Sequence, residues 1–506
     1  MRFTTLTFLV FFLAFYIVYW TLRPRARLPL IVVGSLVFYA AWSLAFSLHF
    51  FGMVVLNYWL IEYFLRPAPS RRRITLILIV NFGNLFLFKY FYFFLGSLYD
   101  GGLLLGEITG ADLAGIKIFQ EENFNAWMEN ASGIKSIVLP LAISFYTFQL
   151  TAYAVDVYRG RIPERSRPLE FFTFILFFPQ LIAGPIMRHS DFFHQLREIR
   201  PDENKTLDGM FLLAQGVIKK VVIADNIAPL IAPIFNNPEL YDWRANFMAA
   251  AGFSVRVYCD FSGYTDIARG LGKLLGLELP ENFRAPYLSA SFREVWTRWH
   301  VTLSTWIRDY VYIPLGGSRY SEIRNFFTIV LAFALSGLWH GAAYTYLVWG
   351  MLHGVFLAVE RSLRRSRDHL LASWSRRDPS AHGAWETRVN RPWVRFIRRV
   401  SAVSFIFLSW ILVTAIFNAP GLSEAFTMLW RIFSFAGEGL AGSDNKLIGG
   451  MLLVTILLNF LQARGDRPLF QERKARYALA FGMCLLTAVL LGHFSPGGRD
   501  FIYFRF

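Results

Sequence analysis

The chain has 506 residues, of which 55% are hydrophobic, 18% aromatic and only 17% charged. Soluble domains carry roughly 25% charged residues, so this composition excludes a water-facing globular protein and indicates a membrane protein. The formal net charge of +16 fits basic cytoplasmic segments of a membrane bundle better than a nucleic-acid-binding surface. The two cysteines lie in apolar surroundings, which argues against a disulfide framework or a thiolate metal site.

Apolar segments recur from the first residues to the last. A spanning helix needs about 20 mostly apolar residues. The segments that satisfy this are 4–21, 28–47, 49–65, 74–97, 137–155, 325–348, 400–418, 446–463 and 476–494. We therefore predict an all-α polytopic membrane protein. Residues 1–20 lack the basic start and cleavage site of a signal peptide, so we interpret them as a retained helix.

Charge differs between the segments that connect these helices. Residues 23–27, 66–73 and 159–167 are basic, whereas 98–135 is predominantly acidic. Because cytoplasmic loops carry the excess of Lys and Arg, we expect the N-terminus and an acidic loop at 98–135 outside. The long polar link 361–399 holds eleven arginines and is expected to be a cytoplasmic loop near anionic headgroups, with an acidic carrier protein as the alternative partner.

One apolar segment is interrupted. "FFPQLIAGPI", residues 177–186, contains two prolines and is followed by further basic residues. A simple span would place one basic end outside, so we predict a re-entrant or broken helix. Such backbone is tolerated at membrane depth only where protein or a wet cavity satisfies it.

Polar residues at membrane depth are functional candidates, and here they gather between residues 139 and 353. The stretches are "LPLAISFYTFQ" with Gln149, "YCDFSGYTDIARGLG" with Asp260 and Asp266, "VWTRWHVTLSTWIRDYVYIPLGG" and "LSGLWHGAAYTYLVWG". Both aspartates are equally well explained as packing partners of Arg256 or Arg269.

Two histidines stand out, because His300 and His340 each follow a tryptophan in an apolar segment. A buried imidazole tends to stay neutral, which suits a general base acting on a hydroxyl. If 296–309 is helical, Ser304 lies on the same face as His300 and offers it a hydrogen-bond partner. On a continuous helix His353 would point away from His340, toward a packing role. No third ligand has the spacing of a metal site.

Taken together, these motifs and "ENFRAPY" resemble the membrane-bound O-acyltransferase family, over roughly residues 135–355. The closest resemblance is to its bacterial branch of alginate O-acetylases, peptidoglycan O-acetylating proteins and the teichoic-acid D-alanylation protein. The resemblance implies about 10–12 transmembrane and re-entrant helices around a central funnel or tunnel. It divides the chain into helices 1–135, a catalytic core 136–360, the basic loop 361–399 and helices 400–506.

The same resemblance implies roles for individual residues. His340 in "LWHG" would be the catalytic histidine, and His300 in "RWH" a supporting one. An acyl group, most simply acetyl, would pass from a cytoplasmic thioester to a hydroxyl outside. We add Arg298, Trp299 and Trp339 as candidate oxyanion donors. The further supporting candidates are Asp260, Ser304 and Gln149.

The C-terminal "RDFIYFRF" contains one hydroxyl, that of Tyr503. It is either an interfacial anchor or, by resemblance, a temporary acyl carrier activated by His340. The resemblance also implies a periplasmic acetyltransferase or esterase-like partner, a polysaccharide or peptidoglycan acceptor, the inner membrane as location, and acetyl-CoA or an acyl-carrier thioester as donor substrate, with no bound cofactor. The alternatives are a transporter or channel that uses the intramembrane histidines, and a scaffold without chemistry.

Overall fold

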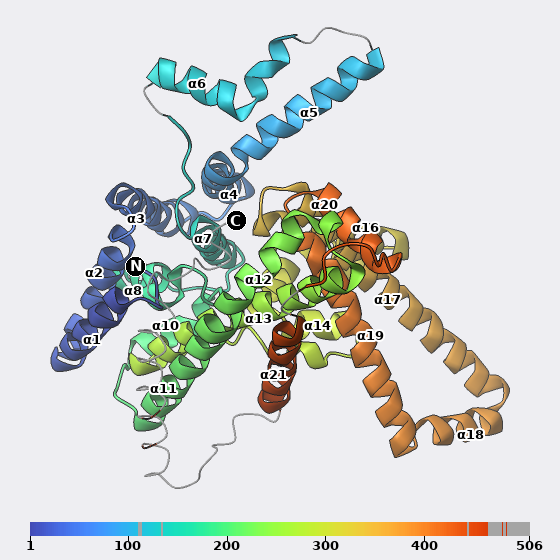
Figure 1. The fold of residues 1–506 in the computed structure, drawn as a ribbon. Coiled ribbons are helices and arrows are strands. Elements are labelled where there is room, and N and C mark those ends of the chain that lie inside the picture. Colours follow the sequence, from blue (N-terminus) through green and yellow to red (C-terminus); the bar gives the residue numbers. More distant parts are fainter. Residues whose placement is uncertain (110–113, 133–134, 443–444, 464–477, 479–481, 483–506) are drawn as a thin grey trace. The chain divides into compact units, whose positions relative to one another are not determined.

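The computed structural model describes residues 1–109, 114–132, 135–442 and 445–463, together with 478 and 482. The described residues form helices joined by short connections, with no strand among them (Figure 1). Within the described residues, five helical stretches are long and apolar enough to span a bilayer: Leu44–Leu65, Arg71–Thr109, Glu322–His340, Pro392–Asn418 and Asn445–Ala463. The protein is therefore an all-α polytopic membrane protein, as the composition predicts.

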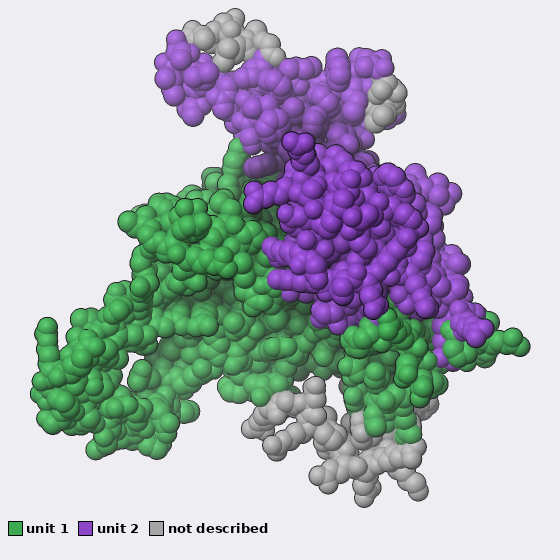
Figure 2. Space-filling view, turned by 180° about the vertical axis from the view of Figure 1, so that it is seen from behind, with its two compact units in different colours: residues 1–24, 183–187, 194–506 green, residues 25–182, 188–193 purple. Residues whose placement is uncertain are grey.

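The chain divides into two compact units, which Figure 2 distinguishes by colour. Unit 1 comprises residues 1–24, 183–187 and 194–506, and unit 2 comprises 25–182 and 188–193. Unit 2 contains α2 (Pro24–Ala40), α3 (Leu44–Trp59), α4 (Arg71–Leu85), α5 (Phe91–Thr109), α6 (Glu121–Ser132), α7 (Ile143–Tyr158), α8 (Pro168–Leu176) and α9 (Phe178–Leu181).

Unit 1 is built around α13 (Trp243–Leu274), a helix of 32 residues that is buried along most of its length. Its remaining helices are α1 (Leu6–Thr21), α11 (Glu203–Val217), α12 (Asp225–Asn236), α14 (Phe292–Arg298), α15 (Val301–Ile307), α16 (Glu322–His340), α17 (Tyr344–Arg377), α18 (Pro379–Val389), α19 (Pro392–Asn418), α20 (Leu422–Phe433) and α21 (Asn445–Ala463). α10 (His189–Leu196) crosses the boundary between the units.

Polar N-caps set several helix starts that hydropathy placed elsewhere. The predicted segments 28–47 and 49–65 meet instead at residues 41–43, because the Ser43 hydroxyl accepts the Phe46 N–H and begins α3 at Leu44. Ser70 caps α4 in the same way, through the Arg73 N–H. A hydroxyl that satisfies a free backbone N–H therefore outweighs the apolar character of the surrounding residues.

Glycines let α11 and α13 approach backbone to backbone. A Cβ on Gly216 would lie 2.5 Å from the carbonyl oxygen of Gly263, and one on Gly263 would lie 2.7 Å from that of Gly216. Gly209 and Gly270 form a second reciprocal pair, seven residues along each helix, with 2.9 and 2.7 Å. Small residues at such contacts are how helices pack closely in membranes, where lipid supplies no hydrophobic drive for association.

Two segments predicted as loops are largely helical. The acidic segment 98–135 contains the end of α5 and all of α6, and α6 has an apolar face that hydropathy averages conceal. The basic segment 361–399 consists of the end of α17, α18 and the start of α19, which form an arm (Figure 1). Lys and Arg are good helix formers, so high charge does not prevent these residues from continuing the helices on either side.

The prediction of a broken helix at 177–186 is confirmed. α8 ends at Leu176, the single turn of α9 follows, and residues 182–188 are non-helical although nearly all are buried. Pro179 enters at the start of α9, where its missing N–H is no loss, and Pro185 lies in the extended part.

Candidate functional site

His340 is the last residue of α16, and the chain leaves the helix at Gly341 with φ −169°. A Cβ on Gly341 would lie 2.2 Å from the ring of Tyr346, so only glycine fits this turn without displacing the tyrosine. The predicted span 325–348 is therefore two helices, with the break directly after the histidine. His340 is 2% exposed.

The hairpin of α16 and α17 is held closed by glycines at its contact. A Cβ on Gly337 would lie 2.2 Å from the carbonyl oxygen of Tyr346, and one on Gly350 would lie 2.3 Å from that of Phe333. These atoms are backbone on both sides, so neither can move aside alone. The position of His340, one helical turn after Gly337, depends on this close approach.

Replacing Gly337 with Ala is expected to separate α16 from α17 and displace His340. We expect a loss of about 1–3 kcal/mol in stability, the usual range for overpacking, together with lower transferase activity. The matched control is Gly450→Ala in α21, where an added Cβ meets nothing within 4 Å. Thermal unfolding in detergent and the transfer rate would be measured for both. Equal behaviour of the two variants would contradict this account of the hairpin.

His300 sits between α14 and α15 in the left-handed region, with φ 43° and ψ 53°. A non-glycine residue adopts this conformation at a cost of about 1–2 kcal/mol, so neighbouring contacts must hold it. Asn282 supplies them: its carbonyl accepts the Val301 N–H at 3.0 Å, and its side-chain oxygen accepts the Thr302 hydroxyl at 2.6 Å. Strain of this kind, held by buried polar contacts, is typical of functional positions.

The two histidines come together although 40 residues separate them. Their ring centroids are 6.4 Å apart, and the ring of Trp339 contacts both, at 5.8 Å from His300 and 5.1 Å from His340. Phe261 closes the other side of His300 at 4.6 Å, and Trp349 lies edge-on to His340 at 5.3 Å. Both imidazoles are thus enclosed by aromatic rings in a region of low dielectric.

His300 has no side-chain hydrogen bond in the described part of the chain, and it is fully buried. The predicted Ser304 contact is wrong, because the break at His300 ends the continuous helix on which it depended. The Ser304 hydroxyl donates instead to the Trp299 carbonyl at 3.3 Å. Ser304 therefore stabilises the start of α15 rather than the imidazole.

His353 has the packing role that was expected, although the helix assumed for its direction is not continuous. We expected it to point away from His340, but the break at Gly341 folds α17 back along α16. The His353 ring lies 4.8 Å from Trp349, whose opposite contact is His340. His353 therefore belongs to the same group of contacting rings as the histidine pair. This group, here called the aromatic layer, consists of His300, Trp339, His340, Trp349 and His353.

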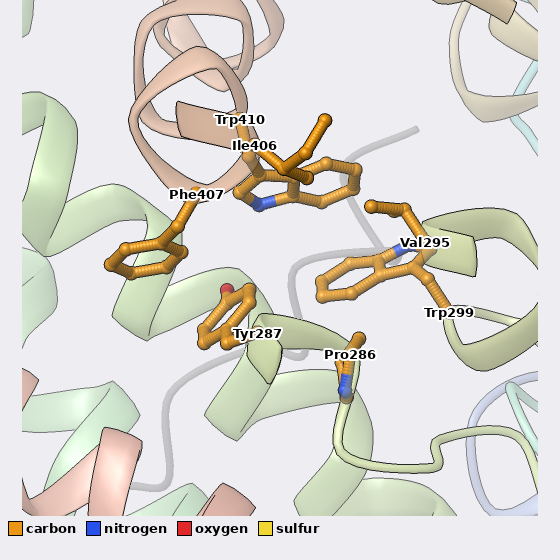
Figure 3. A pocket seen from close by; sticks show the side chains of 7 residues that line it. All are labelled: Pro286, Tyr287, Val295, Trp299, Ile406, Phe407 and Trp410. Carbon is orange, nitrogen blue, oxygen red and sulfur yellow. The ribbon is translucent and has the colours of Figure 1, made fainter. Parts of the chain in front are cut away.

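An apolar pocket in unit 1 lies beside this layer (Figure 3). α19 supplies Ile406, Phe407 and Trp410, and the segment before α15 supplies the rest; the lining residues are Pro286, Tyr287, Val295, Trp299, Ile406, Phe407 and Trp410. Neither histidine of the pair lines it. Trp410 joins the pocket to the layer, since its ring centroid is 5.3 Å from that of His353.

Arg298 does not face the histidines. Its guanidinium pairs with Glu294 at 2.8 Å and donates to the Arg284 carbonyl. Burial alone would raise the pKa of Glu294, but the Ala290 N–H and the Arg399 guanidinium outweigh it and hold the pKa below its usual range. Glu294 and Arg399 thus tie the start of α19 to α14, and oxyanion stabilisation by Arg298 finds no geometric support.

The other two oxyanion candidates differ in position. The Trp339 ring contacts both histidines, as described above. Trp299 lies on the pocket wall, with its ring centroid 4.6 Å from that of Trp410. Of these two candidates, therefore, only Trp339 contacts the imidazoles.

Asp260 and Asp266 pair with lysines that the sequence analysis did not single out. Lys220 Nζ lies 2.5 Å from Asp260 and 2.7 Å from Asp225. Lys219 Nζ lies 2.7 Å from Asp266 and donates to Ser262 at 2.9 Å. Arg269, a predicted partner, reaches Asp266 only at 4.0 Å. The sequence feature that could have indicated these ion pairs is the dipeptide Lys219–Lys220 within an apolar stretch. Two lysines buried there require buried carboxylates as partners.

Two of the remaining candidates lie outside the described part of unit 1. Gln149 belongs to unit 2, where its amide donates to the Gln180 side chain at 3.1 Å. Tyr503 and the predicted span 476–494 lie outside the described residues. No group of three His, Cys, Asp or Glu side chains suited to a metal ion occurs among the residues that were described.

Comparison with known proteins agrees with this geometry. Residues 159–416 match the family model of MBOAT, the membrane-bound O-acyltransferase family. A protein described as "probable alginate O-acetylase AlgI" from Pseudomonas aeruginosa is 35% identical, over 91% of this chain and 80% of its own length. A peptidoglycan O-acetyltransferase from Helicobacter pylori is 29% identical, over 96% and 94%.

A teichoic acid D-alanyltransferase from Bacillus subtilis is 30% identical, over 43% of this chain and 58% of its own length. The segment matched to the family model contains both buried histidines and the pocket. The chain is therefore an O-acyltransferase and belongs to the membrane-bound O-acyltransferase family.

Proposed function

We propose that this protein moves an acetyl group from a cytoplasmic thioester across the bacterial inner membrane, toward hydroxyls of a cell-envelope polysaccharide or peptidoglycan. The observation that carries the proposal is the pair of buried imidazoles 6.4 Å apart in a membrane-embedded core. The relatives named above, which act on alginate, peptidoglycan and teichoic acid, support an envelope acceptor.

The chemistry assigns a role to each imidazole. As a hydroxyl attacks the thioester carbonyl, a nitrogen of His340 takes its proton, the oxygen bonds to the acyl carbon, and the carbon–sulfur bond breaks. The departing thiolate then takes the proton from the imidazolium, which returns His340 to its neutral form. General base catalysis of this kind contributes about 10²- to 10⁴-fold in rate. His300 acts as the supporting group, and the Trp339 indole is the candidate donor to the oxyanion.

We propose that the thioester donor enters through the pocket that Trp410 helps to line. Its walls are aromatic and aliphatic, which suits the methylene-rich arm of a thioester rather than a charged glycan. Acetyl-CoA and an acyl-carrier thioester share that arm. We favour acetyl-CoA because the alginate-type relatives align over most of their length, whereas the D-alanyltransferases align over about three-fifths of theirs.

The arm formed by α17, α18 and α19 is proposed to lie on the cytoplasmic surface. Trp393, Phe396, Ile397 and Val400 are exposed along one face of α19, at helical spacing. Arginines occupy the other faces. An apolar stripe with basic flanks fits the interface of an anionic leaflet, and this placement puts the N-terminus outside by the positive-inside rule. An acidic carrier protein is the competing occupant.

Tyr503 is proposed as a relay that holds the acetyl group before a periplasmic acetyltransferase or esterase-like partner receives it. Tyr503→Phe keeps the aromatic ring and removes only the hydroxyl. We expect it to abolish envelope acetylation while leaving protein abundance unchanged, measured as acetyl esters released from envelope glycans. Full acetylation by Tyr503→Phe would leave that residue only an anchoring role.

Purified protein in proteoliposomes tests the function itself. With labelled acetyl-CoA outside and an alcohol acceptor inside, we expect release of free CoA and labelled ester that depend on the protein. A transporter would instead move solute without consuming thioester, and that result would overturn the proposal. A scaffold would show neither activity.

A further inference from the structure

α21 is an apolar helix that carries two amide side chains on the face it turns toward the rest of unit 1. Leu457 and Phe460 are exposed on its outer side, whereas Asn459 is fully buried and Gln462 is partly buried. The Asn459 side-chain oxygen accepts the Tyr287 N–H at 3.2 Å. Because lipid offers no partner to an amide, polar side chains within a spanning helix are functional candidates.

Gln462 clamps the backbone of residues 282–287, here called the 282–287 loop. Its side-chain nitrogen donates to the Phe283 carbonyl at 2.5 Å, and its oxygen accepts the Ala285 N–H at 2.8 Å. Ala285 has φ 49° and ψ 57°, a left-handed conformation that a residue with a Cβ adopts only where its surroundings hold it. The clamp therefore acts on the loop at its strained residue.

The other edge of the same loop bonds to both neighbours of His300. The Asn282 carbonyl accepts the Val301 N–H at 3.0 Å. The Arg284 N–H donates to the Arg298 carbonyl at 2.9 Å. Successive backbone groups of the loop thus alternate between α21 and the segment that contains the histidine. Any movement of the loop away from α21 would therefore be transmitted to that segment.

Ring contacts follow the same connection. The Phe283 ring lies 5.2 Å from Phe261 and 5.0 Å from Trp299. Phe261 in turn lies 4.6 Å from His300. Releasing the Phe283 carbonyl from α21 would therefore also shift the aromatic wall against which the imidazole packs.

A second glutamine makes the same kind of clamp in the connection between α13 and α14. The Gln195 side-chain nitrogen donates to the Glu278 carbonyl at 3.0 Å, and its oxygen accepts the Glu278 N–H at 2.8 Å. This clamp satisfies backbone groups too, but it holds a residue that precedes the 282–287 loop. Gln195 therefore serves as a matched comparison for Gln462.

We propose that Gln462 is a positioning residue for acyl transfer, because through the 282–287 loop it holds His300 in its left-handed conformation. That conformation places the imidazole with its ring centroid 5.8 Å from that of Trp339 and 6.4 Å from that of His340. The inference rests on the supporting role of His300 in the proposed function. Gln462 acts through the loop backbone rather than on the reacting atoms.

Gln462→Met tests this, because methionine keeps the length of the side chain and removes both hydrogen bonds. We expect kcat with acetyl-CoA in proteoliposomes to fall about ten- to hundredfold, since a misplacement of about 1 Å is enough for such a loss. KM should change little, because a positioned group acts in the transition state. Gln462→Glu offers the same acceptor and, as a neutral carboxyl, the same donor, and should recover most of the rate. Gln195→Met is the control and should keep the wild-type kcat.

A double-variant cycle separates positioning from folding. His300→Asn removes the imidazole, and asparagine tolerates the left-handed conformation better than most residues. In that background Gln462→Met is expected to change kcat by less than about twofold, because the group that it positions is already absent. A residue that only stabilised the fold would lower kcat by the same factor in both backgrounds.

The outcomes distinguish this inference from the proposed function. If Gln462→Met keeps the wild-type kcat, or lowers it equally with and without His300, the positioning role is wrong although the wild type transfers acetyl groups. If the wild-type protein itself transfers none, the proposed function fails. Should Gln462→Met not fold, Gln462→Asn, whose amide is one methylene shorter, decides by the same cycle.

Discussion

Replacing His340 with Ala is expected to lower the rate of acetyl transfer by about 10²- to 10⁴-fold, the usual contribution of a general base. The imidazole is 2% exposed and packs against Trp339 and Trp349. In such surroundings water cannot readily replace it as a proton acceptor. The measurement is the initial rate of labelled ester formation, with acetyl esters on envelope glycans as the cellular counterpart.

His340→Gln is the sharper companion variant, because glutamine keeps polarity at the position but cannot take the proton. We expect it to be as inactive as His340→Ala. His369→Ala, at an exposed position on the arm, controls for the loss of a histidine as such and should retain full activity. Wild-type transfer by His340→Gln at normal protein abundance would exclude the general-base role.

His300 is expected to contribute less than His340, and the two effects should not add. Its ring shares Trp339 with His340, so removing either histidine disturbs the same contact. In the double variant we expect a rate close to that of His340→Ala alone, because residues that act as a unit are not additive. An additive double variant would show that the histidines act separately.

Hydropathy averages composition over a whole helical segment, and five of the nine predicted spans correspond to the stretches that are long and apolar enough to cross a bilayer. It misplaced their ends where single residues decide. Ser43 and Ser70 begin helices by capping, and Gly341 ends one by avoiding a clash with Tyr346. Each of these contacts depends on a single residue, so it leaves no periodic pattern in the sequence.

The residue pattern singled out both histidines and the resemblance gave His340 its catalytic role, but neither predicted that the two rings lie close together. His353 shows the reason: its predicted direction assumed one continuous helix, but α16 ends at His340 and α17 begins at Tyr344. Ser304 failed in the same way, since His300 adopts a left-handed conformation between two short helices. A prediction of which residues share one face of a helix holds only where that helix is continuous.

The buried lysines illustrate a second kind of omission. Asp260 and Asp266 were expected to pair with arginines nearby in the sequence, but their partners are lysines 40 or more residues earlier. In the structure the π-helical stretch Ile218–Ala224 turns Lys219 and Lys220 toward α13. A π-helix has more residues per turn than an α-helix, so two consecutive side chains can contact the same neighbouring helix. The 3.6-residue period of an α-helix does not predict this.

Lys219→Met is therefore expected to destabilise the protein by about 3–5 kcal/mol, because it leaves the Asp266 carboxylate buried without its cation. Both side chains are nearly inaccessible, 1 and 8% exposed, and the Lys219 ammonium also serves the Ser262 hydroxyl. Thermal unfolding in detergent and the yield of folded protein measure the effect. Lys273→Met is the control, since Lys273 contacts a half-exposed Asp208 at 3.4 Å and should cost less than about 1 kcal/mol.

The double variant Lys219→Met/Asp266→Leu separates the two terms that make up a buried ion pair. Removing both charges removes their attraction but also the cost of keeping them out of water, so apolar replacement is often neutral. We expect the double variant to recover most of the stability lost in Lys219→Met. If it stays as unstable as the single variant, the pair contributes through its specific hydrogen bonds to Ser262 and α13. If Lys219→Met alone is as stable as wild type, the ion pair does not hold the π-helical stretch Ile218–Ala224 to α13.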